Sequence, residues 1–428
     1  MRLVLGSINI KGVEFAPDTK LENGLLLINK DQLVTHLKQD NRIESIDIYI
    51  ARPGESIRIL PVKDVIEPRV KVEGSGNIFP GFIGKVDMVG NGRTHVLKGA
   101  AVVTTGKIMG FQEGIIDMIG PGAEYTPFSH TFNIVLKIEP SIGLSQHEHE
   151  NIIRIAGLKA AAYLGETARK LIPDEEEVFE CNNFIQGLEK FPALPKIAYI
   201  YMLQAQGLLH DTYVYGVDAK GILPTFMSPT EIMDGAIISG NCVSACDKNT
   251  TYVHQNNPVI QELYKRHGHD YHFVGIIITN ENVTLADKER SSGFTAKLAK
   301  MLGIDAAIIT KEGFGNPDAD LTMNCRKLEQ KGIKTVLITD EYAGRDGCSQ
   351  SLADTTPEAT AVVTAGNANE TILLPKLTTV IGHIDAADSI AGGFSGSLRP
   401  DGSIEVEIQA ITGATSEVGF TKLSVQSY

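Results

Sequence analysis

The sequence predicts an α/β protein with a mixed α+β, β-rich amino-terminal part and a doubly wound, mostly parallel, Rossmann-like carboxyl-terminal part. Two observations lead to this class. The first 100 residues hold short alternating or apolar stretches separated by turn signals. From Phe273 onward, apolar runs of strand length alternate with runs of helix length, which is typical of parallel strands joined by helical crossovers. At 428 residues, the chain is long enough for two or three domains.

The first 100 residues favour short strands. Gly24–Lys30 and Ser45–Arg52 are alternating or apolar, and the turn signal Arg52-Pro53-Gly54 follows the second stretch. We therefore expect this region to be mainly β.

A long helix is expected to begin at Ser145. Glu148 follows at the spacing of a capping box, and one apolar helical face continues to Leu171. Pro173 should end the helix, because proline lacks the N–H that a helix interior requires. The acidic run Asp174–Glu177 is then expected in a solvated loop.

The region after Phe273 predicts the order β-α-β-α-β within an α/β core of about residues 273–390. The expected elements are strand Phe273–Thr279, helix Lys288–Leu302, strand Ala306–Thr310, helix Asp318–Lys331 and strand Lys334–Thr339. Ala359–Ala365 and Leu377–Ile381 are candidates for further strands. The turn residues Pro400-Asp401-Gly402 indicate a hairpin near the carboxyl terminus.

Charge and composition argue against several classes of protein. The chain has 39 basic and 52 acidic residues, a formal charge of −13, and no concentrated run of Lys and Arg, so neither a nucleic-acid nor a membrane partner is expected. No apolar run approaches bilayer-spanning length, and the first residues do not resemble a signal peptide. Five cysteines, an odd number, argue against a disulfide framework. We expect a cytoplasmic protein.

Common enzyme motifs fail on spacing. Gly74-Ser75-Gly76 begins a dinucleotide fingerprint without its third glycine, and Gly84-Lys85 lacks the Ser or Thr of a P-loop. His147-Glu148-His149-Glu150 contains metal-ligand residue types but not the i,i+4 His pair of helical zinc sites. We expect these four residues to be solvated in the first turn of the long helix.

Unusual local chemistry is concentrated at Gly240-Asn241-Cys242. Gly240 and Asn241 tolerate backbone conformations that other residues resist, so the peptide bond before Cys242 can be held under strain. The Cys242 thiol can then attack the preceding carbonyl and form a thioester. Loss of the α-proton and expulsion of the thioester sulfur, as a thiocarboxylate on the first fragment, leave a dehydroalanine, which hydrolyses with loss of ammonia to a pyruvoyl group with an electrophilic carbonyl. Local sequence alone favours the alternative, an ordinary turn with two buried thiols, Cys242 and Cys246.

The sequence gives less indication of a chemical role for the other cysteines. Cys325 lies on an apolar helical stripe and is expected in the core. Cys348 lies in a polar loop and suggests an exposed thiol, and Cys181 has no partner nearby in the sequence.

The junction and its surroundings resemble a known family. Ser239–Lys248 and Tyr252–Val259 resemble the processing region of the glycine, sarcosine and betaine reductase component B proproteins. The resemblance extends over the whole chain, including Met1–Phe15 and Gly413–Gly419. It implies cleavage of the Asn241–Cys242 bond and conversion of Cys242 into a covalent pyruvoyl cofactor that forms a Schiff base with the substrate.

The same resemblance implies a division of the chain and a function. Residues 1–241 and 242–428 would be two subunits that form a hetero-oligomer with a selenoprotein subunit. With glycine as substrate, this complex and the other glycine reductase components would yield acetyl phosphate and ammonia by reductive C–N cleavage, with electrons from thioredoxin. Sarcosine and betaine are alternative substrates, although the quaternary nitrogen of betaine cannot form an imine. A non-catalytic small-molecule binding protein is the alternative from another class.

Overall fold

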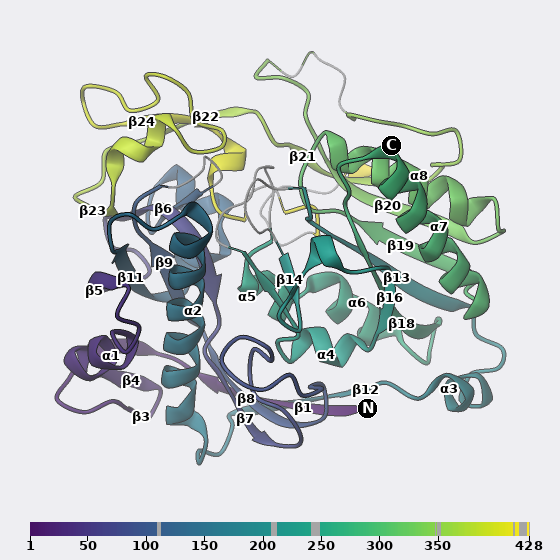
Figure 1. Cartoon of the computed structure of the whole chain (residues 1–428), viewed down its shortest axis with the longest axis horizontal. Helices are drawn as coiled ribbons and strands as arrows, with labels where there is room; N and C mark the ends of the chain where they lie inside the picture. Colours follow the sequence, from purple (N-terminus) through teal and green to yellow (C-terminus); the bar gives the residue numbers. More distant parts are fainter. Residues whose placement is uncertain are drawn as a thin grey trace.

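The computed structural model describes residues 1–108, 113–206, 212–240, 249–346, 348, 352–413, 416–418 and 426–427. These residues form a mixed α/β structure around two large sheets (Figure 1). The α/β class is therefore confirmed. In the part of the chain described, no helix is both long and apolar enough to cross a membrane.

The first 100 residues are mainly β, as predicted, and further strands follow in the rest of the amino-terminal half. Its elements are β1 Arg2–Asn9, β2 Gly12–Phe15, β3 Lys20–Glu22, β4 Leu25–Ile28, α1 Lys30–Leu37, β5 Ile43–Ala51, β6 Ile57–Ile66, β7 Arg69–Glu73, β8 Gly92–Lys98, β9 Ala100–Thr105, β10 Gly114–Asp117, β11 Phe132–Pro140, α2 Gln146–Gly165, β12 Glu175–Glu180, α3 Phe184–Lys190, β13 Lys196–Leu203, β14 Thr212–Val214, β15 Val217–Asp218, β16 Thr225–Met227, α4 Pro229–Met233 and β17 Ile237–Ser239.

The carboxyl-terminal half contains most of the longer helices. Its elements are α5 Thr251–Gln255, α6 Pro258–Arg266, β18 His272–Asn280, α7 Leu285–Met301, β19 Ala306–Thr310, α8 Asn316–Glu329, β20 Lys334–Glu341, β21 Val362–Asn367, β22 Thr371–Leu374, β23 Thr379–Gly382, β24 Ile404–Glu407 and β25 Gln426–Ser427.

Helix α2 covers the first large sheet, whose order is β10-β6-β9-β11-β5 with β23 beside β6. Ser145 caps the helix and forms the predicted capping box with Glu148. The helix is shorter than predicted, because it ends at Gly165 and passes into a short 3-10 turn. A β-carbon at Gly165 would lie 2.1 Å from the Arg69 carbonyl oxygen, so this close approach to β7 requires glycine.

The acidic run after this helix does not form a loop, contrary to the prediction. Residues from Glu175 onward form β12, which pairs with β1 in the order β12-β1-β8-β7. The side chains of Glu175, Glu176 and Glu177 are nevertheless exposed. An edge strand can present charged side chains to water while its backbone is paired.

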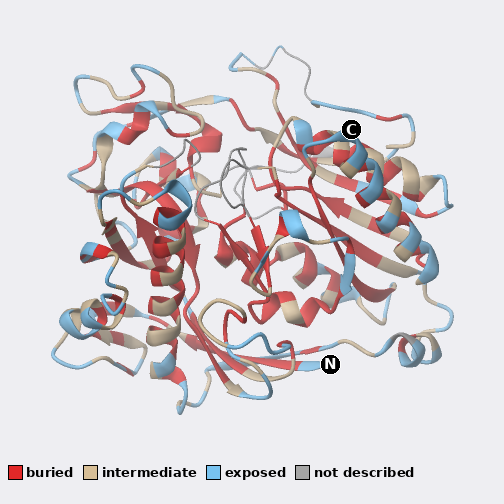
Figure 2. Ribbon diagram, in the orientation of Figure 1, coloured by how far each residue is buried: buried red, intermediate tan, exposed pale blue. Residues whose placement is uncertain are grey.

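The second large sheet has the order β16-β18-β13-β19-β20-β21-β25. The five inner strands are mutually parallel, and β16 and β25 are antiparallel to their neighbours. Helices α7 and α8 pack on one face through Ala198, Ile200 and Met202 of β13. The opposite face, which includes Tyr199 and Tyr201, packs against α5 and α6. Figure 2 shows these strands buried between helices whose outer surfaces are exposed.

The predicted order β-α-β-α-β is confirmed, with shifts of a few residues at most ends. The strand Ala306–Thr310 has the predicted bounds, and α7 begins three residues before Lys288. Strand β13, which lies between β18 and β19, has no counterpart among the predicted elements.

Both large sheets combine strands from residues 1–241 and residues 242–428. Strands β13 and β16, from residues 1–241, lie in one sheet with β18, β19, β20 and β21, from residues 242–428. In the other sheet, β23 from residues 242–428 pairs with β6 from residues 1–241. The predicted strand Leu377–Ile381 is thus shifted to Thr379–Gly382. The expected turn near Pro400 closes with hydrogen bonds from the Arg399 N–H to the Ser403 carbonyl and from the Gly402 N–H to the Arg399 carbonyl, but β24 beyond it pairs mainly with β22.

Candidate active site

The two residues predicted to carry the chemistry, Asn241 and Cys242, lie outside the described residues, as does Cys246. The described chain stops at Gly240, directly after β17, and resumes at Asn249, shortly before α5. The site is therefore built from the residues that hold these two flanks.

A chain of buried hydrogen bonds joins the two flanks. The Ser239 N–H donates to Thr251 Oγ1 at 3.0 Å, and Thr251 Oγ1 donates to Asp64 Oδ2 at 2.6 Å. The Thr251 N–H also donates to Asp64 Oδ1 at 2.9 Å. All three residues are at most 2% exposed. Because Asp64 lies on β6, the first sheet holds both flanks of residues 241–248.

Glu312 anchors the flank at Asn249. The Asn249 N–H donates to Glu312 Oε1 at 3.3 Å. Glu312 Oε2 accepts from the Gln204 N–H at 2.7 Å and from Thr212 Oγ1 at 2.8 Å. This fully buried carboxylate thus ties together three separate stretches of chain.

His254 lies against the same carboxylate. Its Nε2 is 3.4 Å from Glu312 Oε1, and its Nδ1 is 2.7 Å from the Tyr201 hydroxyl. The Asn249 side-chain amide donates to the same hydroxyl at 3.4 Å. Glu312, His254 and Tyr201 therefore form a buried acid–imidazole–phenol set next to the described end of the flank.

These residues gather where the parallel strands end. Gln204 directly follows β13, Glu281 directly follows β18, and Glu312 comes shortly after β19. In this sheet β13 has β18 on one side and β19 on the other. The order of the parallel strands along the chain therefore reverses at β13. Ligands of open α/β sheets bind outside the carboxyl ends of strands, at such a reversal of strand order.

The buried carboxyl groups here have perturbed acidity. Glu281 Oε1 accepts from the Glu312 N–H at 2.7 Å. Burial, and then the charge of Glu312, raises the pKa of Glu281 well above its usual value. Burial also raises the pKa of Glu417, although Lys311 opposes the shift. Carboxyl groups with perturbed pKa values are typical of sites that move protons.

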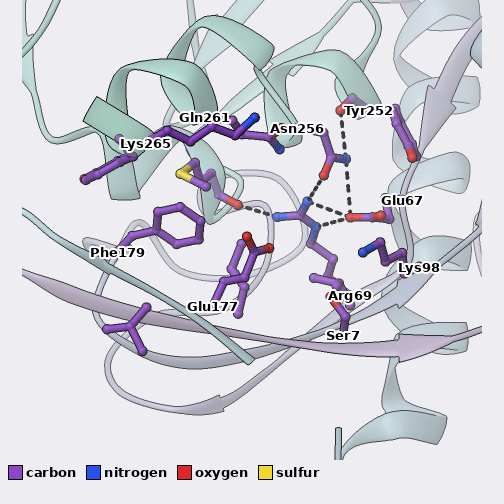
Figure 3. A pocket seen from close by; sticks show the side chains of 15 residues that line it. Ser7, Glu67, Arg69, Lys98, Glu177, Phe179, Tyr252, Asn256, Gln261 and Lys265 are labelled. Carbon is purple, nitrogen blue, oxygen red and sulfur yellow. Dashed lines mark hydrogen bonds and ion pairs between the residues drawn. The ribbon is translucent and has the colours of Figure 1, made fainter. Parts of the chain in front are cut away.

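Helix α5 is also held at its far end. Arg69 donates to Glu67 Oε2 at 2.8 Å, to the Gln255 carbonyl at 3.2 Å and to Asn256 Oδ1 at 3.1 Å. Figure 3 shows the bonds of Arg69 to Glu67 and Asn256 beside a cavity of about 660 Å³. Since Arg69 bonds the carboxyl end of α5 and Asp64 bonds Thr251 at its start, the helix that follows the junction is fixed at both ends.

The histidine-rich turn differs from the prediction. His147 and Glu148 are exposed, but His149 and Glu150 are buried, and Glu150 pairs with Arg154. Burial, and secondarily Lys63, lowers the pKa of His149 to about 4. Among the described residues, no group of three or more His, Cys, Asp and Glu side chains is arranged to hold a metal.

The thiols outside the junction agree with the predictions. Cys325 is fully buried in the core beneath α8, and Cys348 is exposed. Cys181 is half-buried.

Comparison with known proteins then decides the family. The sequence model of the glycine/sarcosine/betaine reductase component B subunits matches residues 1–426. The chain belongs to this family. It is 66% identical, over the full length of both chains, to the glycine reductase complex component B subunits alpha and beta of Acetoanaerobium sticklandii.

Other members of the component B family are more distant. Over the full length of both chains, identity is 56% to the sarcosine reductase complex component B subunit alpha of Peptoclostridium acidaminophilum. It is 38% to the betaine reductase complex component B subunit alpha of the same organism. No solved structure gives a significant match.

Several residues of the site in this component B family member were not predicted from the sequence. Glu281 and Glu312 each follow a predicted strand closely, and a carboxylate at that position was an available signal. His254 lies within the segment that carried the family resemblance. Glu417 lies within Gly413–Gly419, which also carried the resemblance, whereas Asp64 had no local signal, because only tertiary folding brings it to the junction.

Proposed function

We propose that the chain is the precursor of the substrate-binding, pyruvoyl-containing subunits of a glycine reductase. In this proposal the Asn241–Cys242 bond is cleaved, Cys242 becomes a covalent pyruvoyl group, and residues 1–241 and 242–428 are the two subunits. The observation that carries it is the full-length identity of 66% to a glycine reductase component B, against 56% and 38% to the sarcosine and betaine counterparts.

The described flanks support the processing step chemically. Cleavage requires the scissile bond to be held in one geometry, and a Ser239–Thr251–Asp64 chain is suited to hold both sides of it. The thiol and the α-carbon must each lose a proton, and a buried imidazole such as His254 beside Glu312 is suited to accept one.

The sheet supports a binding role. We take the seven-stranded sheet to be doubly wound and Rossmann-like, with the substrate at the carboxyl ends of β13 and β19. The substrate amine would form a Schiff base with the pyruvoyl carbonyl, which makes the nitrogen a better leaving group.

The remaining chemistry needs partners. A selenolate of a selenoprotein subunit would displace the nitrogen at the α-carbon, other glycine reductase components would form acetyl phosphate, and thioredoxin would supply electrons. Cys325 is buried, so it is not suited to replace the selenolate. We propose a cytoplasmic complex of both fragments with the selenoprotein.

Borohydride trapping tests this division of labour. Labelled glycine and borohydride should fix the label on the 242–428 fragment of the isolated protein, without release of ammonia. Ammonia should appear only after the selenoprotein and later components are added. Labelled sarcosine in a parallel reaction tests the substrate, and Cys242→Ala should trap neither. Label confined to the 1–241 fragment, or turnover by this chain alone, would contradict the proposal.

A further inference from the structure

Glu417 is buried beside the junction, and its carboxylate oxygens accept no hydrogen bond from the described residues. Its side chain is 0% exposed, and neither carboxylate oxygen has a hydrogen-bond partner among the described residues. The preceding Ser416 donates through Oγ to Asn249 Oδ1 at 3.1 Å. Glu417 is therefore held next to the first described residue after the proposed cleavage site.

Nearby acceptors share this property. Within the described part of the chain, Glu281 Oε2 and Asp340 Oδ2 are also buried without a hydrogen-bond partner, and so are both side-chain polar atoms of Gln204, the acceptor Oε1 and the donor Nε2. Gln204 and Glu281 directly follow β13 and β18, and Asp340 lies near the end of β20. Buried acceptors that lack donors are costly, and several at one edge of a sheet indicate a ligand that brings N–H donors.

The charges around Glu417 favour a cation. The charged groups that act on it are Lys311, Asp340 and Glu281. Lys311 is already directed at Asp340 Oδ1, at 2.7 Å, and at the Gly313 carbonyl, at 2.6 Å. Burial chiefly raises the pKa values of the Tyr199 and Tyr201 phenols, and the charge of Glu417 adds to both shifts.

Burial favours the neutral acid when the site is empty, because it raises the pKa of Glu417. An entering ammonium ion stabilises the carboxylate instead. The carboxylic acid then loses its proton to solvent, and the carboxylate accepts N–H bonds from the ammonium.

We infer that Glu417 and Glu281 form the binding site for the ammonium group of the amino-acid substrate, and that Glu417 exchanges its proton for that cation. The inference rests on the proposed function for the substrate class. Within the complex, transfer of one proton from the ammonium to the Glu417 carboxylate gives a neutral amine and a carboxylic acid. The neutral amine carries the lone pair that attacks a carbonyl carbon. A trimethylated nitrogen has no N–H to donate and should bind poorly.

Calorimetry of glycine binding to Cys242→Ala tests the inference, because this variant lacks a carbonyl whose reaction would itself release a proton. Titrations in buffers of different ionisation enthalpy should show that glycine binding releases protons. Adding Glu417→Gln should abolish the release and weaken glycine binding about tenfold or more. Acetate and trimethylglycine should release no proton. The exposed control Glu370→Gln should behave as its parent.

Unchanged affinity and proton release in the Glu417→Gln double variant would overturn the inference, as would failure of Cys242→Ala to bind glycine. If Glu417→Gln fails to fold, Glu281→Gln in the same background must weaken binding. In a chain with Cys242 intact, the exposed control Glu370→Gln should leave cleavage unaffected. Absence of cleavage in the wild-type chain would instead contradict the proposed function. The calorimetric test of Glu417 would remain valid, because it uses the Cys242→Ala variant, which does not depend on cleavage.

Discussion

The backbone N–H of Ser239 donates a 3.0 Å hydrogen bond to Thr251 Oγ1, which joins the two sides of the proposed cleavage site. Thr251 Oγ1 in turn donates to Asp64 Oδ2 on another sheet. The flanks of the junction therefore meet at one buried point before cleavage. The same bonds would tie the two fragments together after it.

Thr251→Val should slow cleavage, since valine keeps the shape of threonine but can neither accept from Ser239 nor donate to Asp64. A buried hydrogen bond left unmade costs about 1–3 kcal/mol. If that cost falls on the reactive geometry, cleavage slows roughly tenfold or more. A time course of fragment appearance during cell-free synthesis measures the effect. Thr251→Ser should restore the rate and exposed Thr378→Val should not change it. Wild-type speed in Thr251→Val would show that the contact is only structural.

Cys242→Ala should abolish cleavage and activity together, because alanine offers neither a nucleophile nor a leaving group. Cys246→Ala should leave cleavage largely intact. Cys242→Ser should process slowly through the analogous ester. Denaturing gels of the three purified variants check these outcomes, and normal cleavage of Cys242→Ala would show that another agent cuts the bond.

The cleaved fragments should stay together in native buffer. Strand β13 of residues 1–241 lies between β18 and β19 of residues 242–428, and its inward side chains are buried on both faces. Separation would expose these apolar faces and unpair the backbone of an inner strand. Size-exclusion chromatography should give one species that contains both fragments, which separate only in denaturant. Elution as two folded species would contradict the shared sheet.

His149 should make the free energy of unfolding depend on pH. Its pKa is lowered from 6.5 to about 4 in the folded protein, chiefly by burial. As pH falls from 6.5 toward 4, the unfolded chain binds the proton first, so this contribution to stability is progressively lost. The free energy of unfolding of His149→Asn, measured with urea, should therefore fall less than that of the wild type as the pH is lowered. His147→Asn, exposed two residues earlier, is the matched control and should follow wild type.

Helices and strands could be predicted from the sequence where a local pattern of apolar residues was enough to identify them. Ala306–Thr310 is a short apolar run between helical patterns, and the structure has it residue for residue. Strand β13 is just as apolar, but its place between β18 and β19 depends on pairing with strands far along the chain. His149 and Glu150 were expected in water because they open a helix. They are buried because they continue the face of Ile152 and Ile153, which packs on the sheet.

The candidate site was predictable only in part. The junction was found from its residue types and a family resemblance, and Glu281 and Glu312 followed predicted strands closely enough to be found. Asp64 and Glu417 come from opposite ends of the chain. Their roles depend on sheet packing that no local pattern contains.

Intact mass measurement of the natively expressed protein under denaturing conditions tests the central claim most directly. The account predicts two chains, residues 1–241 and residues 242–428. Compared with a product of simple hydrolysis, the second chain should lack the elements of hydrogen sulfide and ammonia and contain one added water, because Cys242 has become a pyruvoyl group. A single uncleaved chain of 428 residues, or a 242–428 chain that retains its cysteine, would contradict the account.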